Sequence, residues 1–478
     1  MTLIKKSPLP SENENIAVLC RKNTPLVSFG LSPSEIDFAR IEFEKKDKKL
    51  VVINQLRRLV ILSVLDKKDK ESPTLEACRK TGDKIAMLLN EAKKESVVVV
   101  DAIGDTKSTL ALTEGIALGN YQFIKYKTKD VLKESNTLKS IYISSKKVNV
   151  KEVEQIQITV DAVARAKTLV NEPVSTLNAT QLAKEFLQLG KEAGFKVTVF
   201  DKAKIQSLKM GGLLAVNLGS IDPPTFTIME WKPKRVKNKK PVVLVGKGVV
   251  YDTGGLSLKP TGNSMDYMKC DMAGAAAVGG AMYAVAKAKL PMHVIGLVPS
   301  TDNRPGGNAY APGDVIKMHD GQMVEMLNAD AEGRMILADA LSWAKQYSPE
   351  LVIDLATLTG AAAAAVGPLG IVAMGTAGES QKNKLKNSGN KVYERIAEFP
   401  FWEEYDELIK SDIADMKNIG GPFGGAITAG KFLARFTDYP WIHLDIAGPA
   451  FLHTKDSYRG KGGTGTGVRL LFDFLKNY

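Results

Sequence analysis

The stretch Pro241-Val-Val-Leu-Val-Gly-Lys-Gly248 joins a short apolar run to a lysine that stands between two glycines. Such a run, rich in β-branched residues and bounded by proline and glycine, predicts a strand buried on both faces. Strands of this kind occur mainly in parallel sheets that helices cover on both sides. Because polar residues follow the run at once, we expect functional side chains at the C-terminal end of this strand.

The same alternation of strand-like and helix-like segments extends to both sides of this stretch. Apolar runs predict strands at 195–200, 241–245, 293–298, 351–354 and 441–446, and helical periodicity predicts helices at 181–193, 273–288 and 332–346. This order is typical of an α/β domain with a mostly parallel central sheet flanked by helices. We therefore predict a larger C-terminal domain of this class over residues 161–478.

Residues 1–160 mix the two kinds of segment without a chemical motif. Runs bounded by charge predict strands at 50–53 and 96–100, and apolar positions between lysines predict a helix at 75–95. A chain of 478 residues is too long for one ordinary core. We therefore predict a smaller N-terminal α/β domain, with a supporting role or a role in oligomer assembly.

Between residues 247 and 334, charged side chains stand among glycines and other small residues. They are four carboxylates, two lysines and one arginine: Lys247, Asp252, Lys259, Asp271, Asp330, Glu332 and Arg334. Buried carboxylates are costly unless positive charge neutralises them, and two divalent cations would balance four carboxylates. The pattern therefore indicates a two-metal hydrolytic centre. A classical histidine zinc site is disfavoured, because the chain has only 4 histidines and none has a paired spacing.

The composition, 44% hydrophobic and 25% charged, is typical of a soluble globular protein. No apolar run reaches the ~18 residues that a membrane span needs, and the first residues lack the apolar region and cleavage site of a secretory signal. The 3 cysteines are too few and too scattered for a disulfide framework. We therefore expect a cytoplasmic protein that does not bind a membrane.

The net charge of +12 permits binding to nucleic acid. However, the densest basic run, 232–240, precedes a predicted strand and is interpreted as a solvated loop. No stacking motif or reader helix supports such binding. Nucleic-acid binding stays open as an alternative function, as does a different dinuclear metal hydrolase such as a phosphoesterase, although the scarcity of histidines disfavours the latter.

Together, these segments resemble the leucyl aminopeptidases, the two-metal cytosolic exopeptidases of peptidase family M17. The resemblance runs from about Leu169 to the C-terminus. It also includes Asn171-Glu-Pro173, Ala356-Thr-Leu-Thr-Gly360, Asn418-Ile-Gly-Gly, Gly424-Gly-Ala-Ile-Thr-Ala-Gly430 and His443-Leu-Asp-Ile-Ala-Gly448. The order and spacing of the segments carry the resemblance, since each segment alone would be weak.

The resemblance implies hydrolysis of the N-terminal residue of a peptide, preferably leucine-like, by water that two metals activate. It assigns the metals, zinc or manganese with magnesium as an option in one site, to Lys247, Asp252, Asp271, Asp330 and Glu332. It further implies that Lys259 polarises the scissile carbonyl and that Arg334 holds a bicarbonate that shuttles the proton. Both roles make physical sense, since a guanidinium grips a planar oxyanion and an ammonium stabilises developing negative charge.

The same resemblance implies how a peptide with a free N-terminus is held. It places six residues around the substrate: Met268, Asn328, Thr357, Leu358, Gly360 and Ala447. Met268 and Ala447 would line the pocket for the first side chain, although Met268 could equally be a core residue. The family forms hexamers, so the resemblance also implies a homohexamer.

Overall fold

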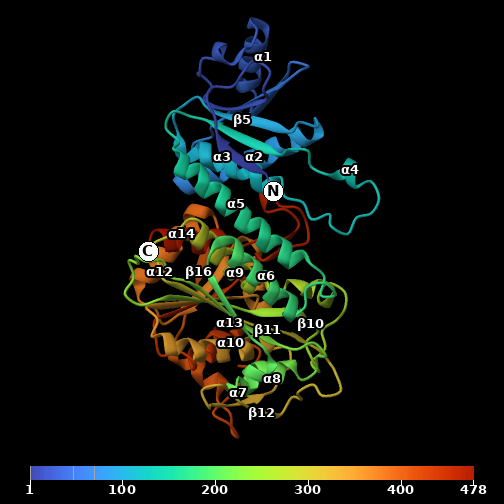
Figure 1. Ribbon diagram of the computed structural model, residues 1–478, viewed down its shortest axis with the longest axis vertical. Helices are drawn as coiled ribbons and strands as arrows, with labels where there is room; N and C mark the ends of the chain where they lie inside the picture. The colour runs from blue at the N-terminus through green and yellow to red at the C-terminus, as the bar shows by residue number, and fades with distance from the viewer. Residues whose placement is uncertain (1, 47, 69) are drawn as a thin grey trace. The chain divides into compact units, whose positions relative to one another are not determined.

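A computed structural model of the chain describes residues 2–46, 48–68 and 70–478 (Figure 1). The chain divides into two compact units. The first comprises Met1–Ala164 and Thr454–Gly460, and the second comprises Arg165–His453 and Lys461–Tyr478. The boundary falls inside one long helix, α5 (Val150–Asn171).

The first unit is built on a six-stranded sheet of order β1-β6-β5-β2-β4-β3. All its pairs are parallel except that of β3 with β4. The strands are β1 (Leu3–Lys6), β2 (Ile16–Cys20), β3 (Leu50–Asn54), β4 (Leu59–Val64), β5 (Ser96–Asp101) and β6 (Ser140–Ser144). The strands predicted at 50–53 and 96–100 are thus confirmed as β3 and β5.

The helices of the first unit are α1 (Pro33–Glu44), α2 (Glu71–Glu91), α3 (Thr106–Gly119) and the short α4 (Val131–Glu134). Glycines let α2 and α3 pack closely, because a Cβ at Gly115 would lie 2.1 Å from Arg79 O. The returning segment Thr454–Gly460 joins this unit through Tyr458, whose hydroxyl donates to Glu76 Oε2 at 2.8 Å.

The second unit is built on a nine-stranded sheet of order β16-β15-β18-β14-β9-β11-β8-β7, with β10 paired to β11. The strands are β7 (Lys196–Phe200), β8 (Thr225–Trp231), β9 (Val242–Gly246), β10 (Gly248–Asp252), β11 (Val294–Asn303), β14 (Leu351–Ala356), β15 (Ile371–Gly375), β16 (Ile396–Glu398) and β18 (Trp441–Asp445). The central pairs are parallel, whereas β8 runs antiparallel to β11 and β7, and β15 runs antiparallel to β18.

Helices cover both faces of this sheet (Figure 1). One layer contains α6 (Ala179–Ala193), α9 (Ala273–Lys287) and α14 (Val468–Lys476), and the other contains α8 (Gly211–Asn217), α10 (Glu332–Ala344) and α13 (Gly425–Ala434). Every residue of β9 and β14 is therefore buried. The predicted fold class, an α/β chain with a mostly parallel sheet between helices, is confirmed.

Four strands of the nine-stranded sheet, β8, β10, β15 and β16, lie outside the strands predicted from the sequence. β8 was not predicted, and β10 follows β9 after the single residue Lys247. Because β10 pairs with β11, Asp252 is the last residue of a strand rather than part of a loop. The strand predicted at 293–298 also continues to Asn303. Two small sheets complete the unit: β12 (Asp314–Lys317), β13 (Met323–Met326) and β17 (Met416–Lys417), and β19 (Phe451–Leu452) with β20 (Gly462–Gly463).

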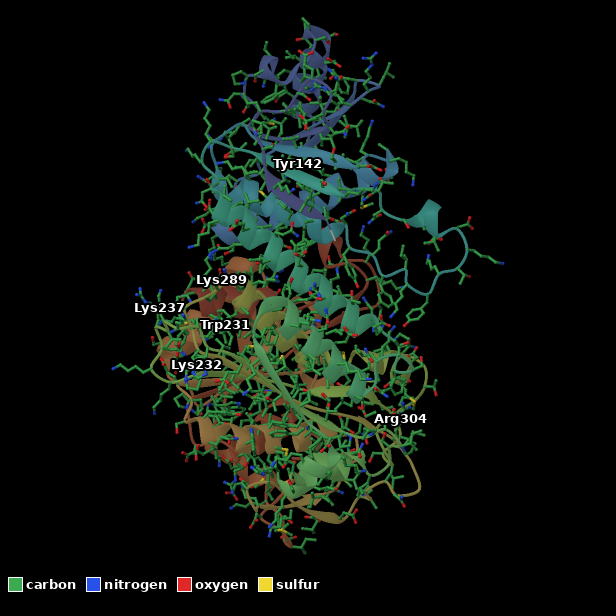
Figure 2. All side chains as sticks on the ribbon, in the orientation of Figure 1. Tyr142, Trp231, Lys232, Lys237, Lys289 and Arg304 are labelled. Atoms are coloured by element: carbon green, nitrogen blue, oxygen red, sulfur yellow. The ribbon has the colours of Figure 1, made fainter. Side chains whose placement is uncertain are left out.

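The basic run 232–240 connects β8 to β9 outside regular secondary structure. Lys232 and Lys237 are exposed at the edge of the unit in Figure 2. This confirms the interpretation of the run as a solvated loop. Among the described residues, no helix is both long enough and apolar enough to span a membrane.

Candidate metal centre

The candidate site lies at the edge of the second sheet where its parallel strands end. Lys247 follows β9, Asp252 ends β10, Thr357 follows β14 and Asp445 ends β18. The strand ends are tied together, since Lys247 N donates to Leu355 O at 3.0 Å. In open α/β sheets the carboxyl ends of the strands are where ligands bind. The topology therefore gathers residues that are far apart in the sequence.

Three carboxylates meet at this edge. Ligand oxygens of Asp252, Asp271 and Glu332 all lie within 4.8 Å of one another. Asp271 follows the 3₁₀ turn η2 (Met265–Cys270), and Glu332 begins α10. The three residues are only 2%, 4% and 1% exposed, respectively, so water cannot screen their mutual repulsion.

Lys247 lies between two of these carboxylates. Its Nζ is 2.8 Å from Asp271 Oδ2, 2.8 Å from Glu332 Oε1 and 2.9 Å from Thr357 O. Burial disfavours the ammonium form, but the carboxylates together outweigh burial and raise the pKa of Lys247. The glycine after Glu332 makes this approach possible, because a Cβ at Gly333 would lie 2.6 Å from Lys247 Nζ.

Lys259 forms the second bridge. Its Nζ is 3.0 Å from Asp252 Oδ2 and also pairs with Asp330 Oδ1. Burial, Asp252 and Glu332 raise the pKa of Asp330 to about 7, against the opposing effect of Lys259. Burial likewise raises the pKa of Asp271, with Lys247 opposing it. Two lysines thus neutralise the four carboxylates only in part.

The donor atoms of this cluster fit divalent cations. Among the described residues, Glu332 Oε2 is buried without a hydrogen-bond partner. A buried carboxylate oxygen without a partner carries the full desolvation cost, which a bound cation would offset. Oxygen-rich sites suit manganese and magnesium, and carboxylates also bind zinc. We infer that Asp252, Asp271 and Glu332 are suited to hold metal, with Asp330 and Lys247 beside them.

Arg334 lies in the first turn of α10 and is only 8% exposed. Its Nη1 donates to Asn418 O at 2.7 Å, while its Nε has no hydrogen-bond partner within the described part of the chain. Burial lowers the pKa of Arg334 to about 10, although Glu332 and Asp445 favour its charged form. A buried guanidinium with a free N–H is suited to hold an oxyanion.

The structure ties three of the six residues expected around a substrate, Thr357, Leu358 and Ala447, to carboxylates at this edge. The hydroxyl of Thr357 donates to Asp271 Oδ1 at 2.7 Å. The backbone N–H groups of Leu358 and Ala447 both donate to Asp445 Oδ1, at 3.2 and 3.1 Å. Two adjacent segments of the sheet edge therefore share one anchor beside the carboxylate cluster.

The remaining expected residues lie on the segments that lead into the cluster. Gly360 is exposed and begins α11 (Gly360–Val366). Asn328 Oδ1 accepts from Asp330 N at 2.8 Å. Met268 is half-buried in η2, whereas the core residues Met272 and Met282 have no exposed surface. Met268 is therefore not a fully buried core residue.

Three residues that position the cluster, two by their side chains and Asn418 by its backbone carbonyl, were given no role from the sequence. Asn303 Nδ2 donates to Asp252 Oδ1 and to Ala329 O, both at 2.9 Å. The backbone carbonyl of Asn418 accepts from Arg334 Nη1, and the Asp445 carboxylate accepts from the backbone N–H groups of Leu358 and Ala447. A usable signal existed for Asn303 and Asp445, because each polar residue ends an apolar strand at the functional edge of the sheet.

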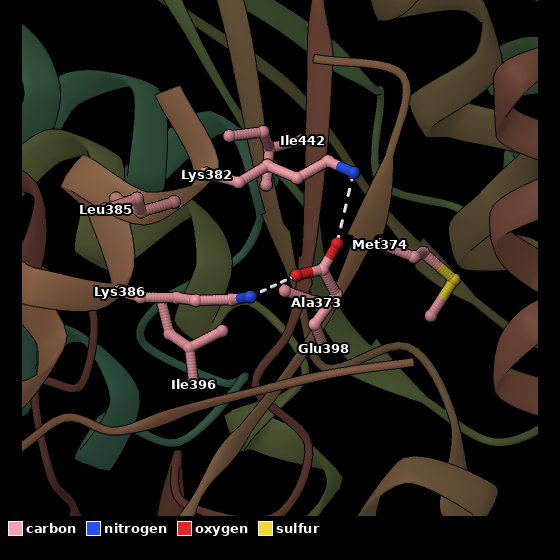
Figure 3. A pocket seen from close by; sticks show the side chains of 8 residues that line it. All are labelled: Ala373, Met374, Lys382, Leu385, Lys386, Ile396, Glu398 and Ile442. Carbon is pink, nitrogen blue, oxygen red and sulfur yellow. Dashed lines mark hydrogen bonds and ion pairs between the residues drawn. The ribbon is translucent and has the colours of Figure 1, made fainter. Parts of the chain in front are cut away.

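A small cavity elsewhere in the second unit is not a second site. It lies against β15 and β18, where Glu398 pairs with Lys382 at 3.0 Å and with Lys386 (Figure 3). Its volume of about 10 Å³ holds at most one water molecule.

Comparisons with known proteins agree with this geometry. Residues 164–472 match the model described as the cytosol aminopeptidase family, catalytic domain. The probable cytosol aminopeptidase of Chloroherpeton thalassium is 44% identical over 445 residues, which cover 85% of each chain. A mutant of tomato leucine aminopeptidase is similar at a TM-score of 0.89 and 26% identity, covering 100% of this chain and 97% of that one. The bottromycin maturation enzyme BotP in complex with Mn is similar at a TM-score of 0.86 and 28% identity, covering 97% and 99%.

Proposed function

The chain belongs to the cytosol aminopeptidase family of metallopeptidases, and we propose that it removes leucine-like residues from the free N-terminus of peptides with two bound metal ions. The observation that carries this proposal is the buried cluster of Asp252, Asp271 and Glu332, whose oxygens lie within 4.8 Å of one another. A cluster with this much uncompensated negative charge is suited to a pair of cations rather than to structural support.

The metals would be held by Asp252, Asp271, Asp330, Glu332 and Lys247. Bound there, they would supply a Lewis acid and a means of generating the nucleophile from water near neutral pH. Lys247 can donate a lone pair only when it is neutral, which requires cations strong enough to reverse the effect of its carboxylate neighbours. The manganese named for BotP supports Mn²⁺ as one occupant, and zinc, or magnesium in one site, fits the same donors.

Lys259 and Arg334 would act on the reacting groups. The ammonium of Lys259 is fixed by Asp252 at 3.0 Å, and in that position it would stabilise negative charge on the scissile carbonyl oxygen. The unpartnered Nε of Arg334 would hold a bicarbonate, which would supply the base for proton transfer. Each residue is held by the protein before substrate binds, so little reorganisation is needed.

The peptide would lie along the edge formed by two segments. Thr357, Leu358 and Gly360 would contact its backbone, and Asn328 would border the metals. Met268 and Ala447 would line the pocket for the first side chain, where an adaptable methionine suits leucine-like groups. Membership of the family further supports a homohexamer in the cytoplasm, with the first unit in a supporting role.

The test is release of p-nitroaniline from leucine p-nitroanilide by the purified protein. We expect turnover with manganese or zinc, its loss after chelation and its return when metal is added back. Absence of turnover from folded protein that holds two metal ions per chain would exclude leucine-type specificity.

Nucleic-acid binding is the second candidate, because the first unit contains a lysine-rich hollow. This hollow has a volume of about 860 Å³, and its basic lining residues are Arg21, Lys22, Lys45, Lys46, Lys48, Lys49, Lys67 and Lys68. Many of these lysines already form ion pairs. Glu42 pairs with Lys45 and Lys48, and Asp66 pairs with Lys49 and Lys68. The remaining positive charge is modest, so we rank this function second. Salt-dependent binding of duplex DNA would support it, and turnover of p-nitrophenyl phosphate would instead favour a phosphoesterase.

A further inference from the structure

We propose that Asp445 is a positioning residue that sets the conformation of the substrate loop, residues 357–360, and thereby the affinity and side-chain selectivity of the enzyme. This inference rests on the proposed aminopeptidase function. Asp445 is not among the residues that would touch the metals or the peptide. Its role would be to hold the backbone that does.

Three donors converge on the carboxylate of Asp445. Asp445 Oδ1 accepts from Leu358 N at 3.2 Å and from Ala447 N at 3.1 Å, and Oδ2 accepts from Thr359 Oγ1 at 2.7 Å. Asp445 is 1% exposed, so water cannot replace these bonds if the carboxylate is lost. Buried donors left without an acceptor are costly, and the segments would rearrange to satisfy them.

Thr359 links Asp445 to the first turn of α11. Its hydroxyl donates to Asp445 and accepts from Ala362 N at 3.0 Å, as the N-cap of the helix. One hydroxyl thus fixes both the end of the loop and the start of the helix that begins with Gly360. The position of Gly360 therefore depends on Asp445 through a single side chain.

The substrate loop is held at two separate points. At its start, Thr357 is bonded to the metal centre through Asp271 and Lys247, at 2.7 and 2.9 Å. At its end, Asp445 bonds Leu358 and Thr359. Register supports this division, because Asp445 pairs with Ala356 where β14 and β18 both end. Loss of the second anchor would loosen the substrate side and leave the metal side in place.

The experiment compares Asp445→Asn and Thr359→Val with Thr359→Ser and the exposed control Asp438→Asn, whose side chain is 66% exposed. Asparagine keeps one accepting oxygen for the backbone N–H groups, and valine removes the threonine hydroxyl without changing its shape. For each variant, kcat and KM are measured with leucine, valine and phenylalanine p-nitroanilides, together with metal content and thermal midpoint.

We expect KM to rise about tenfold in Asp445→Asn and Thr359→Val, with kcat changed less than about threefold, as for loss of a positioning hydrogen bond. The leucine-to-valine preference should fall, metal content should stay at the wild-type level, and Thr359→Ser and Asp438→Asn should behave as wild type. Equal loss of kcat for all substrates with unchanged KM, or loss of metal, would overturn the proposal. If Asp445→Asn does not fold, the Thr359 pair decides.

The same experiment distinguishes failure of the proposed aminopeptidase function from failure of the positioning role of Asp445. If the aminopeptidase function fails, the wild type would hydrolyse none of the anilides. Binding of leucyl-leucine to the metal-loaded wild type and to Thr359→Val, measured by calorimetry, would then still test whether Asp445 and Thr359 set the affinity for a peptide. Equal affinity would overturn the positioning role.

Discussion

The metal centre of the second unit and the lysine-rich hollow of the first contain the same chemical pairs in opposite environments. Lys247 lies 2.8 Å from Asp271, and their side chains are 3% and 6% exposed. Lys68 lies 2.6 Å from Asp66, and their side chains are 47% and 27% exposed. The two ion pairs have nearly the same N–O distance, but one is buried and the other is exposed to solvent.

The difference shows which charges can carry function. In the hollow, water screens the lysines, so each pair contributes little and can be lost without consequence. In the metal centre, removing any one charge leaves its partners buried and uncompensated, which is strongly unfavourable. A buried cluster of this kind is costly to keep, and the pair of cations that we propose for it would offset that cost.

The largest effect should follow from Glu332→Gln, which removes a buried charge from the metal centre. We expect kcat/KM to fall at least about 10⁴-fold, or about 5.5 kcal/mol in the barrier, because the site loses an oxygen donor and its charge balance. Metal content should fall with it, measured by mass spectrometry of the dialysed protein. Glu407→Gln is the matched control, since the Glu407 side chain is 65% exposed. Wild-type activity in Glu332→Gln would show that buried charge at this site is not needed for function, and the contrast with the exposed hollow would fail.

The second largest effect should be on the free energy of unfolding, at the buried Asp354 outside the metal centre. Asp354 accepts from Trp441 Nε1 and bonds His443 Nδ1, both at 2.6 Å, and all three side chains are fully buried. Asp354→Ala would leave an imidazole and an indole without a partner, so we expect a loss of about 3 to 5 kcal/mol in the free energy of unfolding. Urea denaturation measures it. A loss below about 1 kcal/mol would show that burial does not govern the cost of a broken pair here.

A third effect should appear as a dependence of stability on pH. Asp339 is fully buried in α10, where it accepts from Leu213 N at 2.9 Å and His319 N at 3.0 Å. Burial raises the pKa of Asp339 from 3.8 to about 7, against these hydrogen bonds. The folded chain then binds a proton that the unfolded chain has released. The contribution is therefore fully present below pH 3.8 and is lost as the pH rises through about 7.

Asp339→Asn tests this sign, since asparagine does not titrate. Relative to the variant, the wild type should lose about 2 kcal/mol of stability between pH 5 and pH 7 and only about 0.4 kcal/mol more above pH 7. Thermal or urea midpoints at several pH values give the difference, with Asp438→Asn as the exposed control. Parallel pH profiles for wild type and Asp339→Asn would contradict it.

The fold class was predictable because its decisive signal is local. The apolar run 242–245 has one stable environment, a strand covered on both faces, and it forms β9. That these charged side chains meet in one buried cluster was also predictable, because four carboxylates among small residues need positive charge close by. The resemblance to leucyl aminopeptidases then gave each residue a proposed role.

The roles of the positioning residues could not be predicted from local sequence patterns. That Asp445 supports Leu358 follows from the register of β14 with β18, in which Ala356 pairs with Asp445. A strand that is buried on both faces does not fix its register by alternation, so the sequence could not supply this pairing. The return of Thr454–Gly460 to the first unit is equally non-local, since Tyr458 bonds Glu76 across 382 residues.

The smallest effect should follow from Asp66→Ala in the lysine-rich hollow. Hydrogen bonds from Lys49 and Lys68 lower the pKa of Asp66, so its contribution exists above pH 3.8 and is lost as the pH falls. Because both partners are solvated, we expect a change below about 1 kcal/mol at low salt, and less at high salt. Activity on leucine p-nitroanilide should equal that of wild type. A loss above about 2 kcal/mol, or a change in KM, would show that an exposed pair can matter as much as Lys247 and Asp271 do, and burial would then no longer explain the difference between the two regions.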